Sequence, residues 1–144
     1  MKEPIRVFID GGSRGNPGPA GFGVHAEDSD GNVLAELYGY LGCTTNNVAE
    51  YAGLLAALQW MREQECSAFN LFSDSQLLVR QYHGKYRVRS QGLLPLYRRA
   101  RTLASGIPAL HVNHVRREQN RQADALANRA MDERNGNTPS PLLE

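Results

Sequence analysis

Three strand-like segments occupy the first part of this chain, before any helical pattern begins. Residues 5–10 alternate Ile and Val with Arg and Phe, which is the two-residue period of a strand. Residues 21–27 and 33–41 read as two further strands, and the Ser-Asp-Gly-Asn sequence at 29–32 between them favours a hairpin turn. Strands joined by short connections pair antiparallel, so the chain is predicted to begin as a three-stranded antiparallel sheet.

Helical and strand-like segments alternate through the rest of the chain. The predicted elements are, in order, a helix at 46–65, a strand at 68–73, helices at 75–82 and 93–104, a strand at 110–115 and a helix at 120–131. Ser75 and Asn120 are expected to cap the helices that follow them. The order β-β-β-α-β-α-α-β-α predicts an α/β fold, in which a mixed five-stranded sheet has three antiparallel strands followed by two parallel ones and is flanked by helices.

The length and composition are those of one globular domain. The chain has 144 residues, of which 41% are hydrophobic and 22% charged. Residues 1–133 are expected to form a single domain, and residues 134–144, which are rich in Asn, Gly and Pro, a flexible tail. No apolar run approaches the roughly 18 residues of a membrane-spanning helix.

The cellular setting is expected to be the cytoplasm. The N-terminus leads almost directly into a strand, which leaves no room for a signal peptide. Cys43 and Cys66 lack the spacing of metal ligands, and two thiols in such a chain are expected to stay reduced. A monomer without an obligate protein partner is the expected state.

Positive charge is concentrated in one part of the chain, although the net charge is only +1. Residues 75–117 contain no Asp or Glu. The basic residues of this stretch are Arg80, Lys85, Arg87, Arg89, Arg98, Arg99, Arg101, Arg116 and Arg117. Because a solvated helix usually mixes the two signs, a block of one sign favours a surface that faces a polyanion.

Four carboxylates stand at the ends of predicted elements. Asp10 and Asp74 end strands, and Glu50 and Asp124 lie in or near the first turns of helices. In open α/β sheets, ligands bind beyond the carboxyl ends of the strands. Each carboxylate also has an ordinary structural explanation, because Asp forms turns and acids in a first helical turn favour the helix dipole.

A glycine-rich run follows Asp10 and distinguishes it from a simple turn former. Residues 10–21 read Asp-Gly-Gly-Ser-Arg-Gly-Asn-Pro-Gly-Pro-Ala-Gly, which suggests a backbone in close approach to a ligand. The run lacks the Gly-Lys-Ser/Thr triplet of a phosphate-binding loop. It also leads into a strand and not a helix, which excludes a dinucleotide fingerprint.

Four sequence blocks together resemble the type 1 ribonuclease H family, also called ribonuclease HI. They are the run at 10–21, Thr-Asn-Asn-Val-Ala-Glu-Tyr at 45–51, Ser-Asp-Ser-Gln at 73–76 and Arg-Arg-Glu-Gln-Asn-Arg-Gln-Ala-Asp-Ala-Leu-Ala-Asn at 116–128. The blocks occur in the family's order, and the resemblance covers about residues 4 to 132. It implies a ribonuclease H-like fold and an endonuclease that cuts the RNA strand of RNA–DNA hybrids, leaving 5′-phosphate and 3′-hydroxyl ends.

The resemblance implies that Asp10, Glu50, Asp74 and Asp124 bind two Mg²⁺ ions, for which Mn²⁺ can substitute. In the family pattern, Asp10 bridges both ions, Asp124 holds the ion beside the attacking water, and Glu50 and Asp74 hold the ion at the leaving group. Elementary electrostatics agrees, since four converging carboxylates repel one another unless cations are present. Mg²⁺ prefers carboxylate, water and phosphate oxygens.

The resemblance also implies contacts to each strand of a hybrid. The residues implied for the RNA strand are Gly12, Ser13, Asn16, Asn47 and Gln76. Small amides and backbone groups suit the reading of the 2′-hydroxyl, which marks RNA. Turn formation by Asn16 and helix capping by Asn46 or Asn47 are the structural alternatives.

The residues implied for the DNA strand are Thr45, Asn46, Lys85, Tyr86, Arg87 and Arg89. Exposed N–H groups at a helix start and basic side chains hold phosphates, and an aromatic ring can pack on a deoxyribose. A place in the hydrophobic core is an equally good interpretation of Tyr86.

The chain departs from many family members in two places. The loop before Asp124 has no histidine, so Arg117 is the candidate for the accessory role in product release, with His114 as a weaker candidate. Residues 81–92 are too few to hold the expanded basic protrusion of some bacterial members. The chain therefore resembles a short form of the family, with Arg in place of the mobile-loop His.

Two other functions remain open on the same fold. One is a DNA-cutting recombination nuclease or transposase core, which would need further DNA-binding segments. The other is a catalytically weak or silent nucleic-acid-binding module, which would be expected to lack at least one of the four carboxylates.

Overall fold

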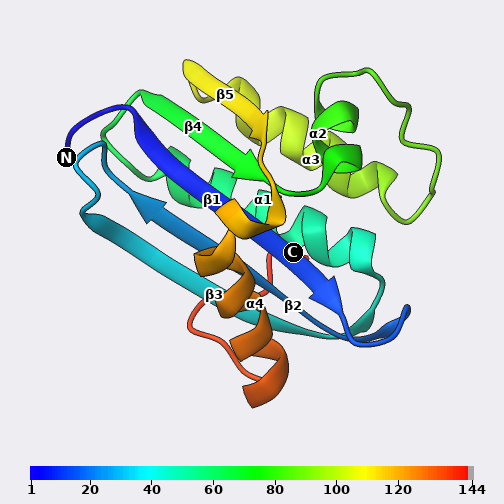
Figure 1. Cartoon of the computed structure of the whole chain (residues 1–144). Coiled ribbons are helices and arrows are strands. Elements are labelled where there is room, and N and C mark those ends of the chain that lie inside the picture. The colour runs from blue at the N-terminus through cyan, green and yellow to red at the C-terminus, as the bar shows by residue number, and fades with distance from the viewer. Residues whose placement is uncertain (143–144) are drawn as a thin grey trace.

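A computed structural model describes residues 1–142 and contains one five-stranded sheet (Figure 1). The strands are β1 (Ile5–Ser13), β2 (Gly18–Glu27), β3 (Val33–Thr44), β4 (Ala68–Ser73) and β5 (Ala109–His114). Their order across the sheet is β3-β2-β1-β4-β5. β1 to β3 pair antiparallel, and β4 and β5 continue the sheet in parallel. The predicted mixed sheet is confirmed.

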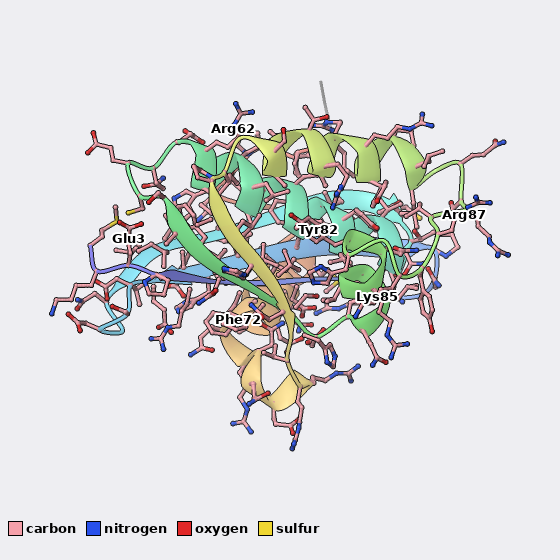
Figure 2. All side chains as sticks on the ribbon, turned by 90° about the horizontal axis from the view of Figure 1, so that it is seen from above. Glu3, Arg62, Phe72, Tyr82, Lys85 and Arg87 are labelled. Carbon is pink, nitrogen blue, oxygen red and sulfur yellow. The ribbon has the colours of Figure 1, made fainter. Side chains whose placement is uncertain are left out.

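Helices cover both faces of this sheet. They are α1 (Asn46–Arg62), α2 (Gln76–Tyr82), α3 (Leu94–Ser105) and α4 (Arg121–Glu133), with the 3₁₀ turn η1 (Arg117–Gln119) before α4. Figure 2 shows α1 and α3 on one side of the sheet and α4 on the other. The predicted element order is confirmed, although α1 ends at Arg62, three residues before the predicted end.

The main core lies between the sheet and α1. Ile5, Val7 and Ile9 point to this face and are almost completely buried. They meet the leucines of α1, including Leu54 and Leu58. Alternate strand residues share one face, so the residues between them, up to and including Asp10, point to the α4 face.

Glycines let two helices approach β1 and β2 closely around Asp10. A Cβ at Gly11 would overlap the backbone of Ala49 in α1, and a Cβ at Gly53 would lie 2.9 Å from the Asp10 carbonyl oxygen. On the other face, a Cβ at Gly23 would overlap the Ala123 carbonyl oxygen and lie 2.6 Å from the Leu126 Cβ in α4. Gly11 is therefore needed for contact with a helix, and the expectation that the glycine-rich run also approaches a ligand stays a prediction.

Asp10 lies within β1 and not at its end. The predicted strand stopped at Asp10, but antiparallel pairing with β2 continues through Ser13 opposite Ala20. On the other side of β1, pairing with β4 stops at Ile9 opposite Ser73. Asp10 is thus placed where β4 leaves the sheet, which brings it beside Asp74.

The segment after α4 lies along the edge strand β3. Asn137 accepts a hydrogen bond from the Tyr38 N–H at 2.9 Å and donates one to the Glu36 carbonyl at 2.8 Å. Leu142 packs against the core. Asn137 and Leu142 thus have specific partners, and the flexibility of the tail at residues 134–144 stays a prediction. The last two residues of that tail, 143 and 144, lie outside the described residues. None of the helices in the described part of the chain has the length and apolar character needed to cross a membrane.

Candidate active site

Four elements bring the predicted carboxylates to one pocket. Asp10 comes from β1, Glu50 from α1, Asp74 from the residue that follows β4, and Asp124 from the first turn of α4. All four line a single cavity of about 580 Å³. The chain separates these residues by up to 114 positions, so only the packing of α1 and α4 on the sheet brings them together.

Burial and mutual repulsion make negative charge unfavourable in this pocket. Desolvation, the charge of Asp74 and a hydrogen bond with Asp124 raise the pKa of Asp10 to about 8. Desolvation, with a smaller effect from Asp74, raises the pKa of Glu50 to about 7, against an opposing hydrogen bond from Ser75. A divalent cation would relieve this repulsion, and every donor offered by these four residues is a carboxylate oxygen.

The carboxylates fit a hard cation by their chemistry, although their present arrangement is open. Within residues 1–142, no group of three or more His, Cys, Asp or Glu side chains is arranged so that it could hold a metal ion as it stands. Asp124 is exposed, whereas Asp10, Glu50 and Asp74 are half-buried. Binding of a cation by these four carboxylates would therefore require their side chains to move closer together within the pocket.

Two asparagines hold two of the carboxylates, and neither was among the predicted site residues. Asn120 Nδ2 donates to Asp74 Oδ2 at 3.3 Å, and Asn128 Nδ2 donates to Asp124 Oδ1 at 3.3 Å. Asn120 occupies the N-cap position of α4 as predicted, but its side chain makes no capping hydrogen bond. The capping interpretation of its side chain is wrong because the amide turns into the core, where it is fully buried.

Arg14 connects the glycine-rich segment to α4. Its guanidinium donates to Asn128 Oδ1 at 3.2 Å and forms an ion pair with Asp132 at 2.6 Å. Arg14 also lines the carboxylate pocket. Sequence reasoning missed this link, because no local pattern relates residues so far apart.

The candidate RNA-strand residues divide into two groups. Gly12, Ser13 and Asn47 line the carboxylate pocket. Asn16 lies outside its lining and accepts a hydrogen bond from the Asn46 N–H at 3.1 Å. Gln76, the first residue of α2, is exposed and also lies outside the lining.

The candidate DNA-strand residues at the start of α1 take part in local structure. Thr45 caps α1 by accepting a hydrogen bond from the Val48 N–H at 3.2 Å. Asn46 lines the carboxylate pocket, and its Oδ1 accepts hydrogen bonds from the Ser13 N–H and hydroxyl at 2.7 and 3.1 Å. The capping alternative named for Asn46 or Asn47 thus applies instead to their neighbour Thr45.

A second groove, of about 640 Å³, contains the other DNA-strand candidates. Tyr86, Arg87 and Arg89 line it, and Lys85 is adjacent in sequence but outside the lining. Figure 2 shows Lys85 and Arg87 on the segment that follows α2. Tyr86 is 47% exposed and its hydroxyl accepts a hydrogen bond from Arg80 at 2.8 Å, so the core interpretation of Tyr86 is wrong.

The two accessory candidates differ in position. Arg117 is the first residue of η1, is exposed and lines the carboxylate pocket. His114 ends β5, is exposed and lies outside that lining. The geometry therefore favours Arg117 over His114.

Comparison with known proteins shows the family to which the chain belongs. Residues 8–130 match the family model described as "Reverse transcriptase-like". The crystal structure of ribonuclease H1 from the archaeon Halobacterium salinarum is 40% identical, has a TM-score of 0.86, and is matched over 90% of this chain and 98% of that one. The chain belongs to the type 1 ribonuclease H family.

Two other solved ribonuclease H structures are similarly close to this chain. The LC11 ribonuclease H1, solved in complex with an RNA/DNA hybrid, is 39% identical with a TM-score of 0.85, over 90% of this chain and 98% of that one. The N-terminal ribonuclease H domain of a Mycobacterium tuberculosis protein is 43% identical with a TM-score of 0.85, over 89% of this chain and 98% of that domain's chain.

The full-length relatives are longer than the matched region. This chain spans 35% of the length of the bifunctional mycobacterial protein and 65% of the Halobacterium ribonuclease HI. Membership of the type 1 ribonuclease H family implies a divalent metal.

Proposed function

We propose that this chain is an endonuclease that hydrolyses the RNA strand of RNA–DNA hybrids, leaving 5′-phosphate and 3′-hydroxyl ends. The observation that carries the proposal is the convergence of Asp10, Glu50, Asp74 and Asp124 on one pocket, with the pKa of Asp10 at about 8 and that of Glu50 at about 7. Carboxylates gathered in this way disfavour their own ionisation, so the pocket suits paired cations. The family membership supports the same reaction.

Asp10, Glu50, Asp74 and Asp124 would hold two Mg²⁺ ions, with Mn²⁺ as a substitute. When bound, the two ions supply an activated water and stabilise charge on the phosphate and the leaving oxygen. Asp10 would suit the role of a ligand shared by the two ions, because it interacts with both Asp74 and Asp124. The protein's own part is to orient the carboxylates and to present the RNA phosphate to them.

Gly12, Ser13 and Asn47 would read the RNA strand beside the carboxylates. Their backbone and amide groups suit the 2′-hydroxyls exposed in a shallow minor groove. Asn16 and Gln76 would assist from just outside the pocket.

Tyr86, Arg87 and Arg89 in the second groove, with Lys85 beside it, would hold the DNA strand. Thr45 and Asn46 would contribute from the start of α1. Arginines and lysines bind phosphate oxygens, and the exposed Tyr86 ring offers a surface for a sugar without a 2′-hydroxyl.

Arg117 would assist release of the cleaved strand, in a short form of the family that uses Arg where other members have a mobile-loop His. Its place in η1, on the rim of the carboxylate pocket, supports that role, with His114 as the weaker candidate. The protein would act as a monomer in the cytoplasm, where its two free cysteines suit a reducing environment.

A strand-specific assay with Mg²⁺ tests the function. The substrates are an RNA–DNA hybrid, the matching DNA duplex, duplex RNA and the single strands, each labelled on one strand. We expect cleavage of the RNA strand of the hybrid to be far faster than any other. Cutting of DNA alone would indicate a recombination nuclease, and binding without cutting would indicate a silent nucleic-acid-binding module.

A further inference from the structure

Asn120 is a fully buried polar side chain at the junction of three elements that carry the proposed metal ligands. It lies between η1 and α4, and its exposed fraction is 0%. Figure 1 shows this part of the chain crossing in front of β1. A side-chain amide is costly to bury, so its bonding partners show what it contributes.

The two N–H groups of the Asn120 amide join β1 to the end of β4. Nδ2 donates to the Ile9 carbonyl oxygen at 2.8 Å and to Asp74 Oδ2 at 3.3 Å. Ile9 immediately precedes Asp10 and forms the last pair between β1 and β4. The amide thus provides hydrogen bonds at the place where the two strands part.

The backbone of Asn120 is bonded to the backbone of Asp124, another of the four proposed metal ligands. Its carbonyl oxygen accepts a hydrogen bond from the Asp124 N–H at 3.1 Å, in the first turn of α4. One residue is therefore bonded to Asp74, to Asp124 and to the residue before Asp10. It spans up to 111 positions of the chain in doing so.

The orientation of the amide follows from its surroundings. Exchanging Nδ2 and Oδ1 would place an acceptor against both the Ile9 carbonyl and the Asp74 carboxylate. In the observed orientation, Asn120 Oδ1 is buried and has no hydrogen-bond partner among the described residues. The hydrogen bonds of this amide are therefore those of its donor nitrogen, to Ile9 and Asp74.

We infer that Asn120 is a positioning residue, whose amide orients the Asp74 carboxylate and holds the start of α4 against β1. In this way it would keep Asp10, Asp74 and Asp124 close enough to share cations. The inference rests on the proposed function. By binding Asp74 Oδ2, the amide fixes one oxygen of a carboxylate that lines the pocket. Side chains that orient metal ligands in this way typically change metal affinity or activity by roughly 10- to 100-fold when removed.

The test compares Asn120→Ala with Asn120→Ser, which keeps one donor, and with the matched control Asn137→Ala. Asn137 has an equivalent amide, bonded to the backbone of β3. Mg²⁺ affinity is measured without substrate, from the shifts of the Asp74 and Asp124 amide resonances during titration with MgCl₂. The kcat and KM for a hybrid and the unfolding temperature are measured on the same samples, at a temperature where each is folded.

We expect Asn120→Ala to weaken Mg²⁺ binding and lower kcat by roughly 10- to 100-fold, with KM for the hybrid little changed. Asn120→Ser should lose less, and Asn137→Ala should lose stability without a change in Mg²⁺ affinity. If Asn120→Ala does not fold, the Ser variant decides. Asn120 variants that lose stability but keep wild-type Mg²⁺ affinity and kcat would overturn the inference.

The same measurements separate this inference from the proposed function. A wild-type protein that binds Mg²⁺ at these resonances but cuts no hybrid would overturn the proposed function, and the Mg²⁺ affinities of the variants would still decide the role of Asn120. A wild-type protein that neither binds Mg²⁺ nor cuts would overturn both.

Discussion

Asp10 is in an unfavourable environment for a charged carboxylate, because it is desolvated and interacts with both Asp74 and Asp124. Burial of an ionised group without a partner costs folding free energy, and a site that binds cations accepts this cost in the metal-free state. Residues of this kind contribute little to stability and much to chemistry. Substitution should therefore affect activity and stability in opposite directions.

Asp10→Asn is expected to lower hybrid cleavage by several orders of magnitude while preserving the fold, because it removes the carboxylate that would be shared by both ions. Without metal, at a pH near 8, the variant should unfold at a temperature no lower than the wild type, since an uncharged amide avoids the repulsion. Cleavage assays and thermal unfolding followed by circular dichroism check both expectations. Asp30→Asn, at an exposed residue paired with Lys2, is the control. Robust cleavage by Asp10→Asn would contradict the mechanism.

Arg117→Ala is expected to cause a moderate loss of turnover, well below that of Asp10→Asn. Arg117 lies on the rim of the pocket and is exposed, so its loss should slow product release more than bond cleavage. Multiple-turnover rates should fall while single-turnover rates change little. The comparison variant is His114→Ala. Undiminished turnover in Arg117→Ala would point to His114 or to no accessory group.

The two helices that carry Glu50 and Asp124 are held close to the sheet by glycines on the facing strands. Gly11 faces α1 and Gly23 faces α4, at positions where a methyl group would overlap the helix backbone. The distance between carboxylates is thus set by the absence of side chains as much as by the helices themselves. Small residues in strands next to a site often mark such a close approach.

Gly23→Ala is expected to destabilise the protein by about 1–3 kcal/mol, because the added Cβ pushes α4 away from β2. The shift of α4 should also displace Asp124 and lower activity. Urea unfolding and the cleavage assay measure the two effects. Gly92→Ala is the control, because the nearest atom to its added Cβ, in Ser90, lies 3.7 Å away. Equal stability of the two variants would show that α4 tolerates the displacement.

The segment after α4 is expected to add stability through its contacts with β3. Asn137→Ala removes two side-chain hydrogen bonds and leaves the Tyr38 N–H without its side-chain acceptor. We expect a loss of about 1–2 kcal/mol, since each such bond contributes roughly 1 kcal/mol net. Urea unfolding gives the stability, and limited proteolysis of residues 134–142 reports release of the segment. Unchanged protection would show that Leu142 and the backbone suffice.

The charge of the whole pocket should link the stability of the metal-free protein to pH. The pKa of Asp10 in the folded protein is about 8 and that of Glu50 about 7, both above the ordinary carboxyl values of 3.8 and 4.5. The folded protein therefore binds more protons than the unfolded protein between those limits. The contribution of these groups to the free energy of unfolding should fall as pH rises from about 4 to about 8 and then level off.

Mg²⁺ is expected to reverse this loss, because it binds the ionised carboxylates. The stabilisation by MgCl₂ should be larger near pH 8 than near pH 6, as measured by urea unfolding at each pH with and without the salt. Asp10→Asn should show a shallower pH dependence than the wild type, which separates the pocket from other titrating groups. A wild-type profile identical to that of Asp10→Asn would contradict the link.

Local pattern was enough to predict the order of strands and helices, whereas the set of four carboxylates was predicted from the resemblance to the type 1 ribonuclease H family. The two-residue and 3.6-residue periods arise within a few positions of the chain, so they are visible in the sequence. Short-range pattern also predicted the cap at Ser75, which is confirmed. The capping alternative was assigned to Asn46 or Asn47, and the structure places the cap at their neighbour Thr45.

The tertiary structure alone decided the contacts that join distant parts of the chain. The side chain of Asn120 was predicted to cap a helix because a helix begins directly after it in the sequence. In the structure, that side chain donates hydrogen bonds to Ile9 and Asp74 instead. The glycine-rich run suggested a ligand nearby, but only the structure shows that the space beside Gly11 is taken by the backbone of α1. A periodic pattern shows which side of a helix or strand faces inward. Which residue of another element it meets there depends on how the elements pack, and packing is settled only when the whole chain is folded.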